Sequence, residues 1–209
     1  MGHTRPVFAR YYARASLLME RGIAVHREAL LRGLTGRVID VGSGNGLTFA
    51  HYPPTVTEVL AVEPEPHLRA LAQRNAAAAP VPVRVVDATA ADLPVADASY
   101  DAAVASLVLC TVPDQAEALA EMYRAIRPGG QLRFFEHVRA ATTGRLRVQQ
   151  ALDATVWPFF AGGCHCSRDT EAAITRAGFR ITQLTRLHTA DTHLPFPTST
   201  QILGTAIRP

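Results

Sequence analysis

Apolar residues along this chain alternate between short continuous runs and segments in which they recur at helical spacing. Residues 7–34 carry Leu17, Leu18, Val25 and Leu30 on a helical repeat, which predicts one or two helices. Continuous apolar runs are typical of strands that are covered on both faces. Strands are predicted at residues 38–41, 59–62, 83–86, 101–109 and 131–137, and the fourth of these is a nearly continuous apolar run. Strands separated by helical segments predict a parallel sheet packed between helices.

Local signals place helices between these strands. Residues 68–78 have helical spacing, and Asp114, a good N-cap residue, has Glu117 three positions later, which predicts a helix up to Ile126. Pro128-Gly129-Gly130 is then expected to end that helix and turn the chain into the next strand. The whole pattern predicts an α/β fold with a Rossmann-like, doubly wound, mostly parallel sheet and helices on both faces.

The end of the chain has a different pattern. Residues 180–187 and 200–207 have strand composition and predict a C-terminal antiparallel hairpin at the edge of the sheet. We expect a single domain over residues 1–209, in which residues 1–35 form an N-terminal helical cap.

The composition narrows the class of protein. Of 209 residues, 48% are hydrophobic and 19% are charged, as in an ordinary globular domain. All 21 basic residues are arginine and they are dispersed, whereas a nucleic-acid partner would call for a concentrated basic patch.

We find no apolar run of about 18 residues and no secretory signal, so we expect no membrane span and a cytoplasmic location. Three cysteines are too few for a disulfide framework, so we expect reduced thiols.

A glycine-rich loop directly after the first predicted strand is the strongest local motif. In Gly42-x-Gly44-x-Gly46 the missing side chains let the backbone approach a ligand, and the N-terminus of a following helix is expected to offer free N–H groups. The spacing differs from the G-x-G-x-x-G pattern that holds a dinucleotide pyrophosphate. Asp40, just before the loop, would repel a pyrophosphate but suits the positively charged amino-acid portion of S-adenosylmethionine.

Acidic residues end three successive predicted strands. Asp40 ends the first, and Glu63 ends the second roughly 20 residues later, the usual offset of an acid that binds ribose hydroxyls. Asp87, followed by Ala88, ends the third, where a carboxylate can accept a hydrogen bond from an adenine amino group. Each acid alone is also compatible with a helix cap, but the three together favour a nucleoside-containing cofactor.

Four motifs in this order resemble those of class I S-adenosylmethionine-dependent methyltransferases. They are Asp40-Val41-Gly42-Ser43-Gly44, Glu63-Pro64, Asp87-Ala88 and Arg127-Pro128-Gly129-Gly130, and the resemblance runs from about residue 38 to the C-terminus. It implies an enzyme that uses S-adenosylmethionine and releases S-adenosylhomocysteine. The resemblance implies that Asp40, Gly42, Ser43 and Gly44 bind the methionine portion of the cofactor. It implies that Glu63 and Pro64 bind the ribose and that Asp87 and Ala88 bind the adenine. Ser106 and Leu107 would lie under the reacting centre, and Tyr12 would close over the cofactor.

A narrower resemblance lies in the second half of the chain. The strings Leu107-Val108-Leu109-Cys110-Thr111-Val112 and Phe135-Glu136-His137-Val138, followed by Gln150, Asp153, Trp157, Gly163-Cys164, Arg168 and Thr170, are similar to the methyltransferase-like 7 group, the alkyl thiol S-methyltransferases. Those membrane-associated relatives carry a hydrophobic N-terminal anchor that has no counterpart here. The resemblance implies a small-molecule acceptor, with a thiol as the sharper expectation. A thiol with a pKa of about 8.5 is already partly ionised to the nucleophilic thiolate.

His137 is the candidate for a catalytic base or for a group that orients the acceptor, because it ends the fifth predicted strand and histidine titrates near neutrality. A purely structural histidine at a strand end is the alternative. Residues 140–170 are expected to form a substrate lid, or else to pack on the sheet edge without touching a ligand. The candidate acceptor-binding residues are Tyr11, His137, Trp157, Phe160, Cys164 and His165.

The string Gly163-Cys164-His165-Cys166 contains residue types that bind zinc. Zinc sites normally draw four ligands from separated pairs, and here three adjacent residues stand without a second cluster. We therefore expect no bound metal.

Other functions stay open at this point. The same chemistry on carbon, nitrogen or oxygen, for example on a quinone ring or a lipid amine, is an alternative to a thiol acceptor. A non-catalytic S-adenosylmethionine-binding module is an alternative from another class, and the loop spacing argues against a third, a nicotinamide dehydrogenase. Formation of S-adenosylhomocysteine with a panel of acceptors separates the enzyme from the module.

Overall fold

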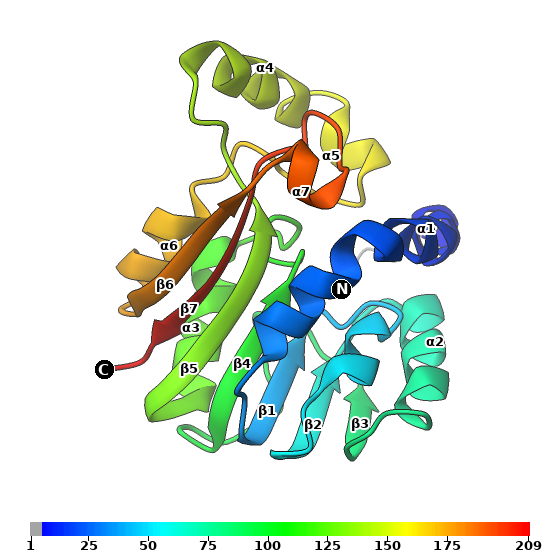
Figure 1. The fold of residues 1–209 in the computed structure, drawn as a ribbon, viewed down its shortest axis with the longest axis vertical. Coiled ribbons are helices and arrows are strands. Elements are labelled where there is room, and N and C mark those ends of the chain that lie inside the picture. The colour runs from blue at the N-terminus through cyan, green and yellow to red at the C-terminus, as the bar shows by residue number, and fades with distance from the viewer. Residues whose placement is uncertain (1–5) are drawn as a thin grey trace.

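The computed structural model describes residues 6–209, in which seven strands form one sheet in the order β3-β2-β1-β4-β5-β7-β6 (Figure 1). Its strands are β1 (Gly36–Val41), β2 (Val56–Val62), β3 (Val83–Val86), β4 (Tyr100–Ser106), β5 (Ile126–His137), β6 (Arg180–Leu187) and β7 (Gln201–Ile207). Strands β1 to β5 run parallel, and β7 is antiparallel to both β5 and β6. This doubly wound sheet with an antiparallel edge pair confirms the predicted fold class.

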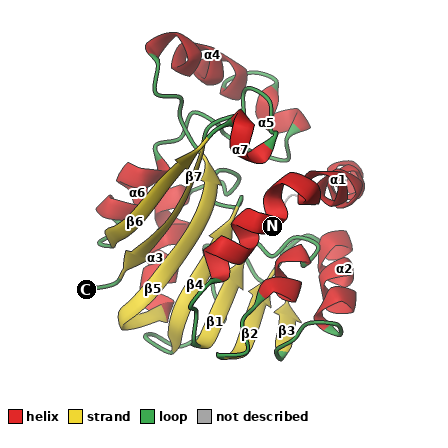
Figure 2. Cartoon of the chain, in the orientation of Figure 1, coloured by secondary structure: helices red, strands yellow, loops and turns green. Residues whose placement is uncertain are grey.

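Helices cover both faces of the sheet (Figure 2). They are α1 (Pro6–Leu31), the 3-10 helix η1 (Leu47–His51), α2 (Pro66–Ala76), α3 (Gln115–Ala125), α4 (Thr143–Asp153), α5 (Trp157–Phe160), α6 (Thr170–Arg176) and α7 (Thr189–Thr192). Because side chains alternate along a strand, Ile39 and Val41 pack in the cluster that includes α3 and α6, whereas Val38 packs in the cluster that includes α1 and η1. The first five residues of the expected helical cap lie outside the described residues.

Two local predictions were wrong in detail. Helix α3 ends at Ala125, before Ile126, and Pro128-Gly129-Gly130 lies inside β5 rather than at a helix end. Tyr100 pairs with Ile126 and Ala102 with Gln131, so the proline and glycines form an irregular bulge in the ladder. The glycine-rich loop leads into the short 3-10 helix η1, so it lacks the full α-helix whose N-terminus was expected to offer free N–H groups.

Parallel pairing brings the carboxyl ends of the central strands to one edge of the sheet. In register, Asp40 of β1 lies beside Val104 of β4, and Ser106 of β4 lies beside Phe135 of β5. Figure 1 shows the arrowheads of these strands pointing to the same edge, with the N-terminal part of α1 and the helices α4 and α5 beyond it. This edge is where open α/β sheets bind ligands.

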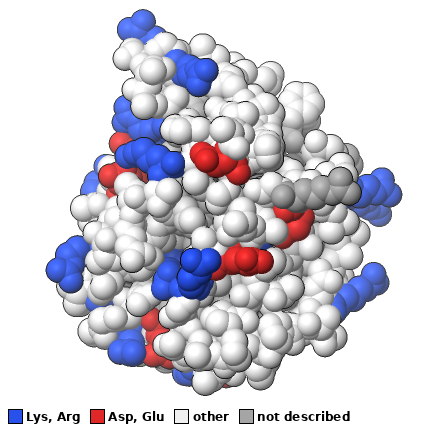
Figure 3. All heavy atoms as spheres, in the orientation of Figure 1, with Lys and Arg blue, Asp and Glu red and all other residues white. Residues whose placement is uncertain are grey.

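Arginine side chains on the face in Figure 3 are dispersed between the rim and the middle of the view and are not gathered into one patch. Among the helices of residues 6–209, none combines the length and the apolar character required to cross a bilayer.

Candidate functional site

The glycine-rich loop turns sharply at the end of β1. Gly42, Gly44 and Gly46 all have positive φ angles, of 68°, 58° and 78°. A Cβ atom on Gly42 would overlap the side chain of Val108, which follows β4, so the loop and the end of β4 touch directly at this glycine. A Cβ atom on Gly44 would meet only Tyr12, at 3.6 Å. The loop therefore passes between β4 and the ring of Tyr12.

Helix α1 is fastened over this loop by polar contacts. The Asn45 side-chain amide donates to the Ser16 hydroxyl over 2.9 Å, and the Arg27 guanidinium donates to the Thr48 hydroxyl over 2.9 Å. These four side chains are buried. Tyr12 thus lies against Gly44 of the loop, and its closure over a cofactor stays a prediction.

Asp40 lies beneath the loop and is 1% exposed. The Tyr52 hydroxyl donates a hydrogen bond to its carboxylate over 3.0 Å. Burial raises the pKa of Asp40 from 3.8 to about 7, although the hydrogen bond from Tyr52 and the charge of Arg27 act in the opposite direction. A buried carboxylate of this kind is stabilised by a neighbouring cation, so the position suits a ligand that carries an ammonium group.

Glu63 ties the first two strand ends together. Its carboxylate accepts hydrogen bonds from the backbone N–H of Gly44 over 2.8 Å and of Glu65 over 2.9 Å. Burial raises the pKa of Glu63, while these two hydrogen bonds lower it. Each carboxylate oxygen has a second lone pair, so Glu63 can hold the loop and still accept hydrogen bonds from a diol.

Asp87 and its neighbours lie at the rim. The Asp87 side chain is 68% exposed and pairs with Arg69 over 3.0 Å. Arg69 also donates to the carbonyl of Pro64 over 2.8 Å, and Ala88 packs against the hydrophobic core. The third acid of the predicted set is therefore more accessible to solvent than the other two.

Two buried hydroxyl groups at this edge have no partner among the described residues: Ser43 Oγ in the glycine-rich loop and Ser106 Oγ at the end of β4. Buried polar atoms are normally satisfied, so these groups fit a polar ligand that runs along the strand ends. Leu107, directly after Ser106, has a φ of 59° and turns the chain away from the sheet.

Glu136 is a site residue to which the sequence analysis assigned no role. It is fully buried, and its carboxylate accepts hydrogen bonds from the backbone N–H groups of Val108, Leu109 and Cys110 over 3.0, 2.9 and 3.1 Å. Burial raises its pKa and these three hydrogen bonds lower it. Glu136 therefore fixes the turn after β4, and the signal in the sequence is an acidic residue inside an apolar strand.

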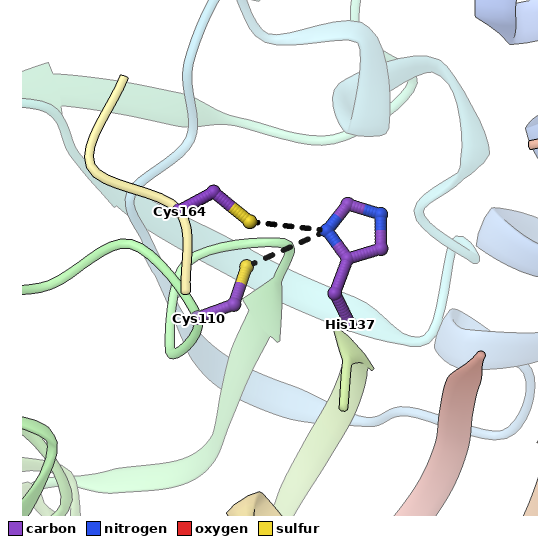
Figure 4. A group of neighbouring side chains, drawn as sticks. All are labelled: Cys110, His137 and Cys164. Atoms are coloured by element: carbon purple, nitrogen blue, oxygen red, sulfur yellow. Dashed lines mark hydrogen bonds between the residues drawn. The ribbon is translucent and has the colours of Figure 1, made fainter. Parts of the chain in front are cut away.

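Cys110, His137 and Cys164 form a cluster at the ends of β4 and β5 (Figure 4). Both thiols point to His137 Nδ1, with Sγ–Nδ1 distances of 3.7 Å for Cys110 and 3.5 Å for Cys164. The other ring nitrogen, Nε2, is buried and finds no hydrogen-bond partner in residues 6–209. Contact with Cys164 and burial raise the pKa of Cys110 well above its ordinary value.

The loop that carries Cys164 is held in place from several sides. The Asp153 carboxylate accepts from the backbone N–H groups of Cys166 and Ser167 over 3.0 and 2.7 Å. Arg168 donates to the Leu109 carbonyl over 2.7 Å, which joins this loop to the turn after β4. Buried Gln149 bridges the backbone of residues 138–140 to Pro197.

The predicted acceptor-binding residues separate into two groups. Trp157 packs against the buried cysteines, and His165 lies next to them but is bonded through Nδ1 to the Gly163 carbonyl over 2.7 Å. Tyr11 and Phe160 are instead largely open to solvent, at 66% and 67% exposed. Tyr11 lies on the solvent side of α1, and the helix places its neighbour Tyr12 on the inner side.

Comparisons with known proteins agree with this geometry. Residues 39–134 match the family model described as a methyltransferase domain. The chain is 33% identical over 159 residues to thiol S-methyltransferase TMT1B of Mus musculus, covering 74% of this chain and 65% of that protein. It is 32% identical over 164 residues to TMT1B of Homo sapiens, covering 75% of this chain and 67% of that protein. The chain thus spans about two thirds of the length of these relatives.

A solved structure shares the fold. It is the geranyl diphosphate C-methyltransferase from Streptomyces coelicolor A3(2) in complex with Mg²⁺, geranyl diphosphate and S-adenosyl-L-homocysteine. Its TM-score is 0.68 at 17% identity, and the match covers 89% of this chain and 77% of that one.

Proposed function

The chain belongs to the S-adenosylmethionine-dependent methyltransferases, and on that premise we propose that it transfers a methyl group from S-adenosylmethionine to a small-molecule thiol. The observation that carries this proposal is the joint position of buried Asp40 and Glu63 at the glycine-rich loop, next to a second cluster of buried polar groups at the ends of β4 and β5. The first cluster suits the cofactor, and the second lies where an acceptor would meet it.

The residues of the loop fit the cofactor. Asp40 would pair with the ammonium group of the methionine portion, and Glu63 would accept from the ribose hydroxyls. The unpartnered hydroxyls of Ser43 and Ser106 would find polar atoms of the ligand, and Tyr12 would cover it. S-adenosylmethionine supplies a methyl group already activated on a sulfonium, so the protein mainly has to align donor and acceptor and exclude water.

On the acceptor side, His137 orients the acceptor or takes its proton. Its Nε2 atom is buried and without a partner in residues 6–209, so the nitrogen is available to a group that enters the site. Residues 140–170 form the lid: α4 and α5 stand over the carboxyl edge of the sheet, and Trp157 of α5 packs against the buried cysteines, which suits an apolar acceptor. The three unpaired thiols support a reducing, cytoplasmic location.

The test is formation of S-adenosylhomocysteine with matched acceptors: a series of alkyl thiols, a quinol, a phenol and an amine. We expect product with alkyl thiols and a slower turnover in His137→Asn. Product formed only with the quinol, or only with the amine, would identify that class of compound as the acceptor in place of a thiol. Cofactor binding without product from any acceptor would indicate a non-catalytic module.

A further inference from the structure

The thiol–imidazole cluster is assembled from three distant parts of the chain. Cys110 lies in the turn after β4, His137 is the last residue of β5, and Cys164 lies in the loop before α6 (Figure 4). Their ligand atoms, two Sγ atoms and Nδ1, all lie within 4.8 Å of one another. The sequence analysis considered only the adjacent residues 164–166 as ligands, and the fold supplies the separated partners that this string lacks.

Two of the three spacings in this cluster match the edges of a metal-centred tetrahedron. Zinc binds sulfur at about 2.3 Å and nitrogen at about 2.0–2.1 Å, so tetrahedral ligand atoms stand roughly 3.5–3.8 Å apart. In the cluster, His137 Nδ1 is 3.5 Å from Cys164 Sγ and 3.7 Å from Cys110 Sγ. A small movement of the side chains would therefore place a cation at equal reach of all three.

We propose that Cys110, His137 and Cys164 bind one Zn²⁺ ion, or a divalent cation of the same thiolate and imidazole preference, and leave one coordination position for the sulfur of the acceptor. The last part rests on the proposed thiol methylation. Two thiolates balance the charge of the dication and the imidazole is neutral, so the site with its three protein ligands carries no net charge into its buried surroundings. Bound through Nδ1, His137 keeps its proton on Nε2, so in this site it orients the acceptor and does not take its proton.

Neighbouring groups already hold the ligands in place. Glu136 accepts from the backbone N–H of Cys110, and the Cys110 carbonyl accepts from the backbone N–H of His165 over 2.8 Å. Asp153 holds the backbone that follows Cys164. Metal ligands are typically oriented by such outer hydrogen bonds.

Whether Cys166 also binds the metal decides whether the site has four protein ligands or three and an open position. Its Sγ atom lies 3.7 Å from Cys164 Sγ, yet it is outside the group whose atoms are all within 4.8 Å. Three protein ligands with one open position are typical of catalytic zinc, whereas structural zinc has four protein ligands. In the open site the acceptor thiol releases its proton, its sulfur forms the bond to the methyl carbon, and the bond from that carbon to the sulfonium sulfur breaks. The products are a thioether, S-adenosylhomocysteine and one proton.

Cobalt titration of the full chain tests the metal site directly. Protein freed of metal with a chelator and kept reduced by a phosphine is titrated with Co²⁺, whose absorption reports tetrahedral geometry and thiolate ligands. We expect one Co²⁺ per chain, displaced by Zn²⁺, and loss of these bands in Cys110→Ser and in Cys164→Ser. The matched variant Cys166→Ser should keep them. Absence of a stoichiometric complex, or a complex that survives in Cys110→Ser and Cys164→Ser, would overturn the site.

A second titration tests the open position. Adding a short alkyl thiol to the Co²⁺ protein, without cofactor, should intensify the thiolate charge-transfer band. No change, or loss of the complex in Cys166→Ser, would indicate a closed four-ligand site and overturn the acceptor part.

Calorimetry with S-adenosylhomocysteine on the same variants separates the two proposals. Retained binding in Cys164→Ser shows an intact fold, so that its loss of cobalt supports the metal site. If the native protein fails to bind S-adenosylhomocysteine, the proposed function fails, while the cobalt result stands on its own.

Discussion

The cofactor side and the acceptor side of this site are built in different ways. On the cofactor side, Glu63 bonds to the backbone of Gly44, a residue 19 positions away, within one strand–loop–strand unit. On the acceptor side, Glu136 reaches Cys110 across 26 positions and Arg168 reaches Leu109 across 59. The first half is encoded locally, whereas the second depends on long-range contacts that form only when the whole sheet and the lid are in place.

The largest effect should come from breaking the cofactor side alone. Asp40→Ala removes the buried carboxylate that would pair with the ammonium group of the ligand, and we expect affinity for S-adenosylhomocysteine to fall by about 3 kcal/mol, roughly 100-fold. Isothermal titration calorimetry measures this. Asp97→Ala, at a side chain that is 78% exposed, is the control and should bind like the native protein. Unchanged affinity in Asp40→Ala would remove Asp40 from the site.

A substitution of Glu136 should disrupt the acceptor side and leave the cofactor side intact. Glu136→Gln replaces one acceptor oxygen by an N–H donor facing backbone N–H groups, and we expect the free energy of unfolding to fall by about 2–3 kcal/mol. Urea denaturation measures this, with exposed Glu117→Gln as the control. The folded Glu136→Gln protein should bind S-adenosylhomocysteine within a few-fold of native and methylate thiols more slowly. An equal loss of cofactor affinity would show that the two sides are not separable.

Gly42 is the point at which both sides meet. Gly42→Ala forces a side chain into a left-handed conformation and against Val108, whereas Gly129→Ala, with a φ of 79° and open space around it, carries only the conformational penalty. We expect a loss of stability of about 2–4 kcal/mol for Gly42→Ala and about 1 kcal/mol for Gly129→Ala. Thermal unfolding of both variants measures the difference, and equal losses would argue against the packing of Val108 on the loop.

The smallest effect is a pH dependence of the cofactor side. The Asp40 pKa of about 7 in the folded protein lies above its unfolded value of 3.8, so this group lowers the stability of the ligand-free protein as pH rises between those values. A cationic ligand favours the ionised carboxylate, so affinity for S-adenosylhomocysteine should rise with pH up to about 7 and then level off. From pH 7.5 down to pH 6.5, across that pKa, the affinity should fall roughly threefold. Asp40→Asn should remove the slope, and an identical slope in that variant would assign it to another group.

The local character of the cofactor side explains what the sequence predicts well. The sequence predicts the first and last residues of β3 and β6 correctly. It also predicts the three acids at the strand ends, because each one follows or ends a short apolar segment. The bulge at Pro128-Gly129-Gly130 was missed because Ile126, which directly follows helix α3, pairs with Tyr100 in the sheet. The strand therefore begins before the proline and glycines that were expected to end the helix.

The acceptor side shows why the rest was not predictable. The role of Glu136 and the meeting of Cys110 with Cys164 depend on how segments far apart in sequence pack together. Tyr11 was assigned by the family resemblance and Phe160 by residue type, and the exposure of both depends on how the helices that carry them pack.

The central claim is that the loop between β1 and β2 binds S-adenosylmethionine. Calorimetric titration of the native protein with S-adenosylhomocysteine, beside a titration with NADH, tests it most directly. The account predicts one S-adenosylhomocysteine bound per chain in the micromolar range and no heat of binding with NADH. Binding of NADH, or no binding of S-adenosylhomocysteine, would contradict it.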